Sequence, residues 1–452
     1  MQESQTNSEI SFGQKLFYSQ GCLGQNIVNL AVVTWIIYFF APPEGTGTRL
    51  ISIGMAGFIM GIGRIIDVIT DPLLGYFSDN ARSRSGRRRP FILWGAPFLA
   101  LTFFLLWLPP VKGESFYNAI WLFIFLNGYF IFLTITGVPY RSVIPDIAPT
   151  SSERISVSMW MALFGSIGAL IAAGTTGPVI QMFGYATMGA ALGVLGWISF
   201  WLSLKGIREK PRSQEDLMTD LSIFGAIKET LRNRQFLAFG ASILAFQIGF
   251  QMFMIVIPYF VKVILRKPEA QVAILQGSFV AVMILALPLW AWIGNKIGKR
   301  NGQQLSLGLV AILFPFFFII GFIPGINQFI QALAYFCVVA IPISGLYVFP
   351  NAIVGDITDY DELLTRKRRE AMYYGGFGFL EKAAWAISAF LIGFILDLFG
   401  YSAENPLGIR LIGPVVGVIA LLGFLAFRTY SLPDQVRGKT LNEIRGVSEK
   451  QR

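Results

Sequence analysis

Two aspartates four residues apart, Asp67 and Asp71, stand inside an otherwise apolar stretch, GFIMGIGRIIDVITDPLLGYF. On a helix this spacing puts both carboxylates on one face, one turn apart. Two neighbouring acids repel each other unless a proton or a cation lies between them. The pair therefore predicts a metal or proton site for a monovalent cation, Na⁺ or H⁺. The alternative is that the acids pair with Arg64 or a neighbouring helix and only hold the helices together.

The apolar composition of the chain makes two acids within one apolar segment unusual. The chain has 452 residues, is 54% hydrophobic and only 14% charged, and has a mean hydropathy of +0.60. Soluble domains are about a quarter charged, and each charge in an apolar span costs roughly 2.5–3.5 kcal/mol. The chain is therefore predicted to be a multi-pass membrane protein. It contains no histidine, so a proton or cation relay must use other side chains.

The elements that position the acids are apolar segments of about 20 residues, long enough to cross a bilayer as helices. We expect an all-α protein with twelve spans, at 16–41, 50–78, 91–110, 117–144, 156–181, 185–204, 235–263, 270–294, 304–323, 327–349, 371–399 and 408–428. Cys22 and Cys337 both fall in apolar runs and form no disulfide framework.

The basic residues predict the orientation of these spans. Most of the 36 lysines and arginines fall in alternate loops and at the two ends of the chain, with a cluster from Arg82 to Arg89. The positive-inside rule then places both termini in the cytoplasm. The net charge of +10 is explained by topology and contact with anionic membrane lipids, and not by nucleic-acid binding. We see no cleaved signal peptide and expect a bacterial inner membrane.

The two halves of the chain contain similar sequence runs in corresponding places. GYFSDNARSRSGRRR after the second span resembles AWIGNKIGKRNG after the eighth, and the run from Pro139 to Asp146 resembles the run from Pro350 to Asp356. A duplicated six-helix unit of this kind is typical of the major facilitator fold. The predicted organisation is a first half at 1–204, a cytoplasmic linker with a short amphipathic helix at 205–234, a second half at 235–428 and a tail at 429–452.

Further polar residues in the spans are candidates for solute binding. Lys382 could neutralise Asp67 or Asp71 or hold an anionic solute group, or it could reach towards the membrane surface. Asn26 could hydrogen-bond a polar solute or join two helices. Tyr373 could stack on a sugar ring or serve only in packing.

Acids and arginines at the inner loops are candidates for a gate. We expect Asp79 to pair with Arg87, Arg88 or Arg89, and Asp356 or Asp359 to pair with the basic run 366–369. The sequence has no phosphate-binding glycine loop, no Cys/His metal set and no nucleophile–base pair, so we expect no enzyme. We expect no cofactor beyond the coupling ion, and a monomer whose partners are a small solute, a cation and membrane lipids.

Three stretches carry a resemblance: RIIDVITDPLLGYFSDNARSRSGRRRPFILWG, VPYRSVIPDIAP and GDITDYDELLTRKRREAMYYGGFGFLEKAAWAI. Together they resemble the glycoside–pentoside–hexuronide:cation symporters over the whole chain. The resemblance implies a major facilitator fold, alternating access, and Na⁺, Li⁺ or H⁺ coupled to a solute. It implies that Asp67, Asp71 and Thr134 bind the cation, with Lys382 close by.

The same resemblance shows departures at the solute site. The family's galactoside-binding aspartate in the first helix is Asn26 here, and its fourth-helix aspartate is Gly137. A stacking tryptophan is Arg141, and a fifth-helix arginine is Met161. The cation site is thus expected to be kept while the galactoside site is rebuilt, with Arg141 as a further candidate for solute contact.

The main hypothesis is a cation-coupled symporter for a sugar, a glycoside or a sugar acid. One alternative is a transporter of lysolipids or other amphiphiles on the same fold, because animal relatives of the family carry lysophospholipids. Another is a sensor or scaffold that keeps the fold without transport, against which the intact Asp67 and Asp71 pair argues.

Overall fold

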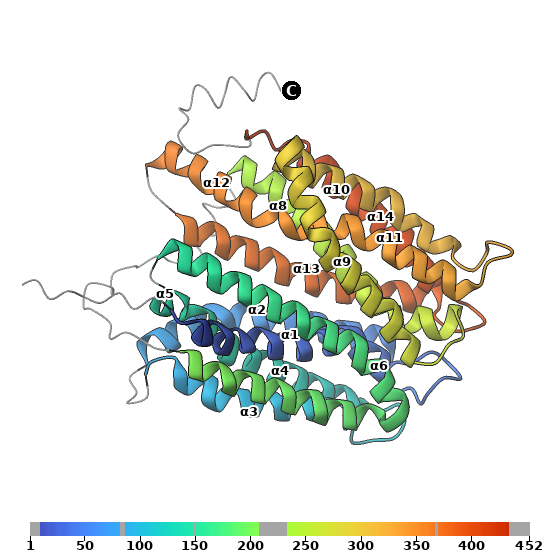
Figure 1. Cartoon of the computed structure of the whole chain (residues 1–452). Coiled ribbons are helices and arrows are strands. Elements are labelled where there is room, and N and C mark those ends of the chain that lie inside the picture. Colours follow the sequence, from blue (N-terminus) through green and yellow to red (C-terminus); the bar gives the residue numbers. More distant parts are fainter. Residues whose placement is uncertain (1–9, 82–85, 149, 208–232, 367–368, 434–452) are drawn as a thin grey trace, which may run out of the picture. The chain divides into compact units, whose positions relative to one another are not determined.

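The computed structural model describes residues 10–81, 86–148, 150–207, 233–366 and 369–433, and every regular element among them is a helix (Figure 1). Within these described ranges, ten helices are long and apolar enough to cross a membrane. An all-helical, multi-pass membrane protein is therefore confirmed. The predicted linker helix at 205–234 and the tail fall largely outside the described residues.

The helices that build the bundle are as follows. The first part of the chain has α1 (Phe12–Phe40), α2 (Ile53–Asn80), α3 (Arg89–Leu105), α4 (Phe116–Ser142), α5 (Ile144–Ile147), α6 (Ser151–Ser203) and the short η1 (Leu204–Gly206). The second part has α8 (Arg234–Tyr259), η3 (Phe260–Ile264), α9 (Ala270–Ile297), α10 (Lys299–Leu313), η4 (Phe314–Ile319), α11 (Gln328–Val348), α12 (Pro350–Thr365), α13 (Glu370–Phe399) and α14 (Leu407–Phe427).

Two differences from the sequence prediction concern how neighbouring segments are connected. The predicted fifth and sixth spans are joined in α6, where Gly184 breaks the helix with φ 81° and ψ 173°, a conformation that glycine adopts readily. The residues after the tenth span, predicted as a loop, form helix α12, which starts with Pro350 at its first turn. Proline fits that position because its missing N–H has no partner there anyway. Helix α12 ends at Arg366, whose φ of 56° is left-handed.

The chain forms two compact units that are each discontinuous in sequence. Unit 1 contains residues 1–32, 69–110 and 120–218, and unit 2 contains residues 33–68, 111–119 and 219–452. Helices α1 and α2 contribute to both units, and the boundary in α2 falls between Val68 and Ile69. Asp67 therefore belongs to unit 2 and Asp71 to unit 1.

Unit 1 is held together at the first part of α1. The rings of Tyr18 and Tyr140 stack at a centroid distance of 4.6 Å. Each hydroxyl donates a hydrogen bond to the backbone carbonyl of the other tyrosine, at 2.5 Å and 2.7 Å. A Cβ atom on Gly21 would lie 2.5 Å from the ring of Tyr140, so this close approach requires glycine.

Unit 2 packs around aromatic side chains. Phe253 on α8 lies 5.7 Å from Phe279 on α9 and 4.9 Å from Phe336 on α11, measured between ring centroids. Helices α9, α10, α11 and α14 lie side by side in this unit (Figure 1). Burial of large aromatic rings of this kind supplies much of the packing energy in a helical core.

Within unit 2, α2 approaches α13 closely. A Cβ atom on Gly57 would lie 2.5 Å from the backbone oxygen of Ala389 and 3.1 Å from Gly393 Cα. Small residues let helix backbones approach in this way. This contact is what brings the charged residues of α2 within reach of α13.

Candidate functional site

The carboxylate of Asp67 lies between two cationic groups in unit 2. Its Oδ2 atom is 3.0 Å from Lys382 Nζ on α13 and 3.4 Å from an Arg64 guanidinium nitrogen one turn earlier on α2. Asp67 is only 2% exposed and Arg64 only 3%. The guanidinium of Arg64 also lies 4.0 Å from the ring centroid of Trp385. Opposite charge and a cation–π contact thus compensate the cost of burying these groups.

This arrangement holds both of the partners that the sequence suggested for Asp67. Lys382 reaches the acid, and Arg64 pairs with it as well. Asp67, one of the two acids predicted as a cation site, thus forms a structural link between α2 and α13. That Asp67 also binds a cation stays a prediction.

Asp71 has a hydroxyl partner in unit 1. Thr134 on α4 donates a hydrogen bond from Oγ1 to Asp71 Oδ1 at 2.9 Å. Asp71 is half-buried, and Thr134 is 4% exposed. Carboxylate and hydroxyl oxygens are hard ligands that suit hard cations. Among the described residues, no three acidic, cysteine or histidine side chains gather as a metal cluster, so a cation at Asp71 would depend on a smaller oxygen set of this kind.

Polar residues of α1 and α4 meet in unit 1. Arg141 donates to Gln25 Oε1 at 3.4 Å, and Asn26 donates to the backbone oxygen of Cys22 at 3.0 Å. A Cβ atom on Gly137 would lie 3.6 Å from Gln25 Nε2. Gln25 of α1 therefore lies next to Gly137 and Arg141 of α4, two of the positions that depart from the family pattern.

Tyr373 lies in a different part of α13 from Lys382. It is fully buried, accepts a hydrogen bond from Asn233 at 3.0 Å, and packs its ring 5.5 Å from Phe236. Nine residues separate it from Lys382, which is about 13 Å along a helix. The structure thus places Tyr373 among hydrogen-bonding and packing contacts and does not bring it together with Lys382.

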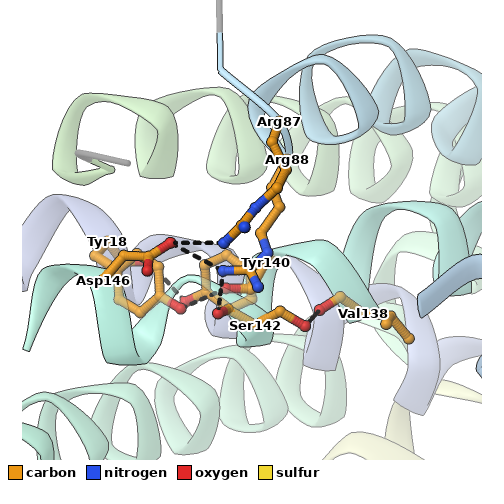
Figure 2. Close-up of polar contacts among 7 residues, drawn as sticks. All are labelled: Tyr18, Arg87, Arg88, Val138, Tyr140, Ser142 and Asp146. Carbon is orange, nitrogen blue, oxygen red and sulfur yellow. Dashed lines mark hydrogen bonds and ion pairs between the residues drawn. The ribbon is translucent and has the colours of Figure 1, made fainter. Parts of the chain in front are cut away.

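Two arginines of unit 1 gather on Asp146 (Figure 2). Its Oδ2 atom lies 2.9 Å from Arg88 and 3.4 Å from Arg87, and Arg88 also donates to the backbone oxygen of Ser142 at 2.5 Å. The sequence had suggested Asp79 as the partner. The side chain of Asp79 lies outside the described part of the chain, so that pairing stays a prediction.

Unit 2 has a corresponding ion pair. Lys299, the first residue of α10, lies 2.5 Å from Asp356 on α12. Arg369, which the sequence offered as a partner for Asp356 or Asp359, pairs at 2.8 Å with Asp361. Residues 367–368 of the same run lie outside the described residues, so the pairing of this run with Asp356 or Asp359 stays a prediction. Asp359 is half-buried on α12, and among the described residues no ion pair is recorded for it.

The partners Asp146 and Lys299 were not among the predicted gate residues. The sequence held a signal for them. Asp146 ends the run that begins at Pro139, and Asp356 ends the similar run that begins at Pro350. Arg88 and Lys299 stand at the starts of α3 and α10, so a basic residue and an acid recur at corresponding places.

Curated relatives cover nearly the whole chain. A putative glycoside/cation symporter of Escherichia coli, YagG, is 23% identical over 94% of this chain and 93% of its own length. An isoprimeverose transporter of Lactiplantibacillus pentosus is 22% identical over 88% and 82%. A sodium-dependent lysophosphatidylcholine symporter of Gallus gallus is 23% identical over 87% and 82%.

A solved structure shows the same fold. The nucleoside transporter NupG superposes with a TM-score of 0.66 at 11% identity, covering 92% of this chain and 98% of that chain. The family model described as MFS/sugar transport protein matches residues 17–434. The chain therefore belongs to the MFS/sugar transport protein family, whose members are membrane transporters and not enzymes.

Proposed function

We propose that the protein is a secondary active transporter that couples the downhill movement of Na⁺ or H⁺ to the import of a glycoside, sugar or sugar acid. The observation that carries the proposal is the buried carboxylate of Asp67, held 3.0 Å from Lys382. Burying an acid and its lysine partner removes both charges from water, which costs free energy. A role in ion coupling explains why the protein has such a pair in an apolar helix.

The proposed cation site uses Asp67, Asp71 and Thr134. The two acids are one turn apart on α2, and Thr134 supports Asp71. An arriving Na⁺ would compete with Lys382 for Asp67, because both neutralise the same charge. Coupling then follows from different affinities in the two states: the cation favours the state in which the solute site is formed.

The proposed topology has twelve spans in two halves of six helices. The kink at Gly184 divides α6 into two spans, and the 17-residue helix α3 adds one that is short but apolar. The distribution of basic residues supports cytoplasmic termini in an inner membrane. Alternating access would open the cavity inward, with Arg87, Arg88 and Asp356 in the inner gate, and with Asp79 and Asp359 as further candidates. We expect a monomer.

The solute class rests on the relatives. One is named a glycoside/cation symporter and another an isoprimeverose transporter. We propose that four residues contribute to solute contact or coupling: Asn26, Arg141, Tyr373 and Lys382. A second candidate function, transport of lysolipids, is favoured by the relatives named lysophosphatidylcholine symporters.

The test is uptake into proteoliposomes that contain the purified full-length protein. The probes are isoprimeverose, the methyl glycosides of xylose and galactose, glucuronate, and lysophosphatidylcholine, each driven by a Na⁺ gradient or a pH gradient. Gradient-driven uptake of a sugar that is lost in Asp67→Asn and Asp71→Asn supports the proposal. Uptake of lysophosphatidylcholine alone would support the second candidate, and undiminished coupling in both variants would refute the cation site.

A further inference from the structure

Three segments from the first half of the sequence belong to unit 2. They are the part of α1 from residue 33 onward, the part of α2 up to residue 68, and the connection 111–119. In the proposed topology α1 runs outward, α2 runs inward, and 111–119 joins two spans outside the membrane. Each of these segments therefore reaches the outer side. Unit 2 thus contains contacts between the two sequence halves at that side.

One side of α1 carries the polar groups of these contacts, and we call it the polar face of α1: Thr34, Tyr38 and Ala41. Residues four and three apart lie on the same side of a helix. Gln276 of α9 donates a hydrogen bond from Nε2 to Thr34 Oγ1 at 2.8 Å. The hydroxyl of Tyr259, the last residue of α8, donates to the backbone oxygen of Ala41 at 2.9 Å. Two helices of the second half therefore bind this face.

Tyr38 joins the polar face of α1 to an ion pair. Its hydroxyl donates to Glu269 Oε1 at 3.5 Å, and Lys262 Nζ lies 2.7 Å from the same oxygen. Glu269 directly precedes α9, and Lys262 lies in the short η3. The rings of Tyr38 and Tyr259 also meet edge-on, with their centroids 5.0 Å apart. Lys262 therefore holds the carboxylate where the phenol reaches it.

The contacts are ordered along the two helices. Glu269 precedes Gln276 along α9, whereas its partner Tyr38 follows Thr34 along α1. The helices therefore run in opposite directions here, and Tyr38 with Glu269 lies further out than Thr34 with Gln276. Burial follows the same order. The side chain of Glu269 is 19% exposed, while Thr34 is 1% and Gln276 0% exposed.

Hydrogen bonds of this kind suit surfaces that separate and meet again. A buried hydroxyl or amide needs a hydrogen-bond partner, and water can replace the protein partner when the surfaces part. A solute that enters from outside must pass between the two halves of such a transporter. Contacts that join the halves at the outer side must therefore break and reform once in each transport cycle.

We propose that the polar face of α1 and its partners on α8 and α9 form the outer gate of the transporter, which is closed in this structure. Thr34 with Gln276 is its buried layer, and Tyr38 with Glu269 is its outer layer. Lys262 is a positioning residue, because it acts through Glu269. This inference rests on the proposed function and topology, and it names the groups that separate when solute enters.

A reversible cross-link tests the gate. Thr34→Cys with Gln276→Cys, in a protein whose native cysteines are replaced by serine, is joined by a short bifunctional thiosulfonate and released by dithiothreitol. We expect isoprimeverose uptake in proteoliposomes to fall at least about tenfold on cross-linking and to recover on release. The matched control is Gln235→Cys with Ser431→Cys, since these residues also contact at 2.9 Å but both lie in the second half. Its cross-link should leave uptake within about twofold.

Thiol labelling detects the gate without any solute. Intact cells that express Thr34→Cys in the cysteine-free protein are treated with a maleimide that does not cross the membrane. We expect Glu269→Ala to speed labelling at least about fivefold, because it removes the outer layer of the gate. Glu404→Ala is the control and should not change the rate. Glu404 is exposed between α13 and α14, and within the described residues no ion pair is recorded for it.

A second pair, Tyr38→Cys with Glu269→Cys, repeats the cross-link in the outer layer and replaces the first pair if that variant does not fold. Uptake that survives the cross-link, or an equal loss in the control pair, would overturn the inference. Equal labelling rates in Glu269→Ala and Glu404→Ala would overturn it too. If wild-type protein moves no sugar, the proposed function fails, and the labelling rates still decide whether the gate exists.

Discussion

Lys382 Nζ lies 3.0 Å from Asp67 Oδ2, and the acid is almost completely sealed from solvent. The lysine comes from α13 and the acid from α2, so the ion pair joins two helices of unit 2. Arg64 reaches the same carboxylate oxygen at 3.4 Å. Asp67 therefore supplies the negative charge that both cationic side chains contact. Substitutions of Asp67 and of its partners should have non-additive effects on stability.

Removal of Lys382 should destabilise the protein. Lys382→Ala removes one of the cationic partners of a buried carboxylate, and we expect a loss of about 2–3 kcal/mol in the free energy of unfolding. Thermal unfolding of the protein in detergent measures it. The double variant Asp67→Asn with Lys382→Ala should lose at least about 1 kcal/mol less than the sum of the single losses. Strictly additive losses would show that the pair contributes no interaction energy.

The hydroxyl of Thr134 should matter for cation affinity. Thr134→Val keeps the shape of the side chain but removes the 2.9 Å hydrogen bond to Asp71. We expect the Na⁺ or Li⁺ concentration for half-maximal uptake to rise about tenfold, with little change in protein stability. Thr136→Val is the matched control, because the hydroxyl of Thr136 donates to the backbone oxygen of Phe132 in its own helix and, within the described part of the chain, contacts no acid. Equal shifts in both variants would contradict a cation role for Thr134.

The ion pair between Arg88 and Asp146 should contribute more than an exposed pair. Asp146→Asn weakens a contact in which both side chains are less than one-fifth exposed, and we expect a loss on the order of 1–2 kcal/mol. Glu114→Gln is the control, since Glu114 meets Arg49 only at 3.8 Å and is 60% exposed. Its loss should stay below about 0.5 kcal/mol. Thermal unfolding compares the two, and equal losses would argue against a structural role for Asp146.

The start of α6 should make stability depend on acid pH. Hydrogen bonds from Thr150, and then from the Ile10 backbone, lower the pKa of Glu153 below its ordinary value of 4.5. A lowered pKa means that the folded state favours the ionised acid. The contribution of ionised Glu153 to the free energy of unfolding is therefore present above pH 4.5. It is lost as the pH falls through the pKa that Glu153 has in the folded protein.

The measurement is the melting temperature of wild type and Glu153→Gln between about pH 6 and about pH 3. The difference between the two proteins should shrink as the pH falls, because both then carry a neutral side chain at 153. Thr150→Ser, which keeps the capping hydroxyl, should follow the wild-type curve. A difference that grows towards low pH would have the wrong sign.

The close approach of α2 to α13 should not tolerate a larger residue. In Gly57→Ala the new Cβ would lie 2.5 Å from the backbone oxygen of Ala389, so the helices must separate. We expect a loss on the order of 2 kcal/mol and reduced uptake, because Asp67 moves with α2. Gly174→Ala on α6 is the control. Its Cβ meets nothing within 4 Å, so its effect should be neutral or stabilising by up to about 1 kcal/mol.

Much of this molecule could be predicted from local features of the sequence. Hydropathy indicated the apolar helices, since each span must satisfy its own backbone hydrogen bonds inside the bilayer. The cost of burying charge singled out Asp67 and Asp71, and the repeat indicated where basic and acidic residues recur. These conclusions need only the residues themselves and their immediate neighbours.

The tertiary structure decided which groups meet. Asp356 contacts Lys299, and Gln247 contacts Glu381, and neither pair was predicted from the sequence. Such pairs depend on the rotation and spacing of helices, which close contacts such as Gly57 against Ala389 fix. A sequence lists the charges that a membrane protein can bury, but the packing of its helices determines the partner of each charge.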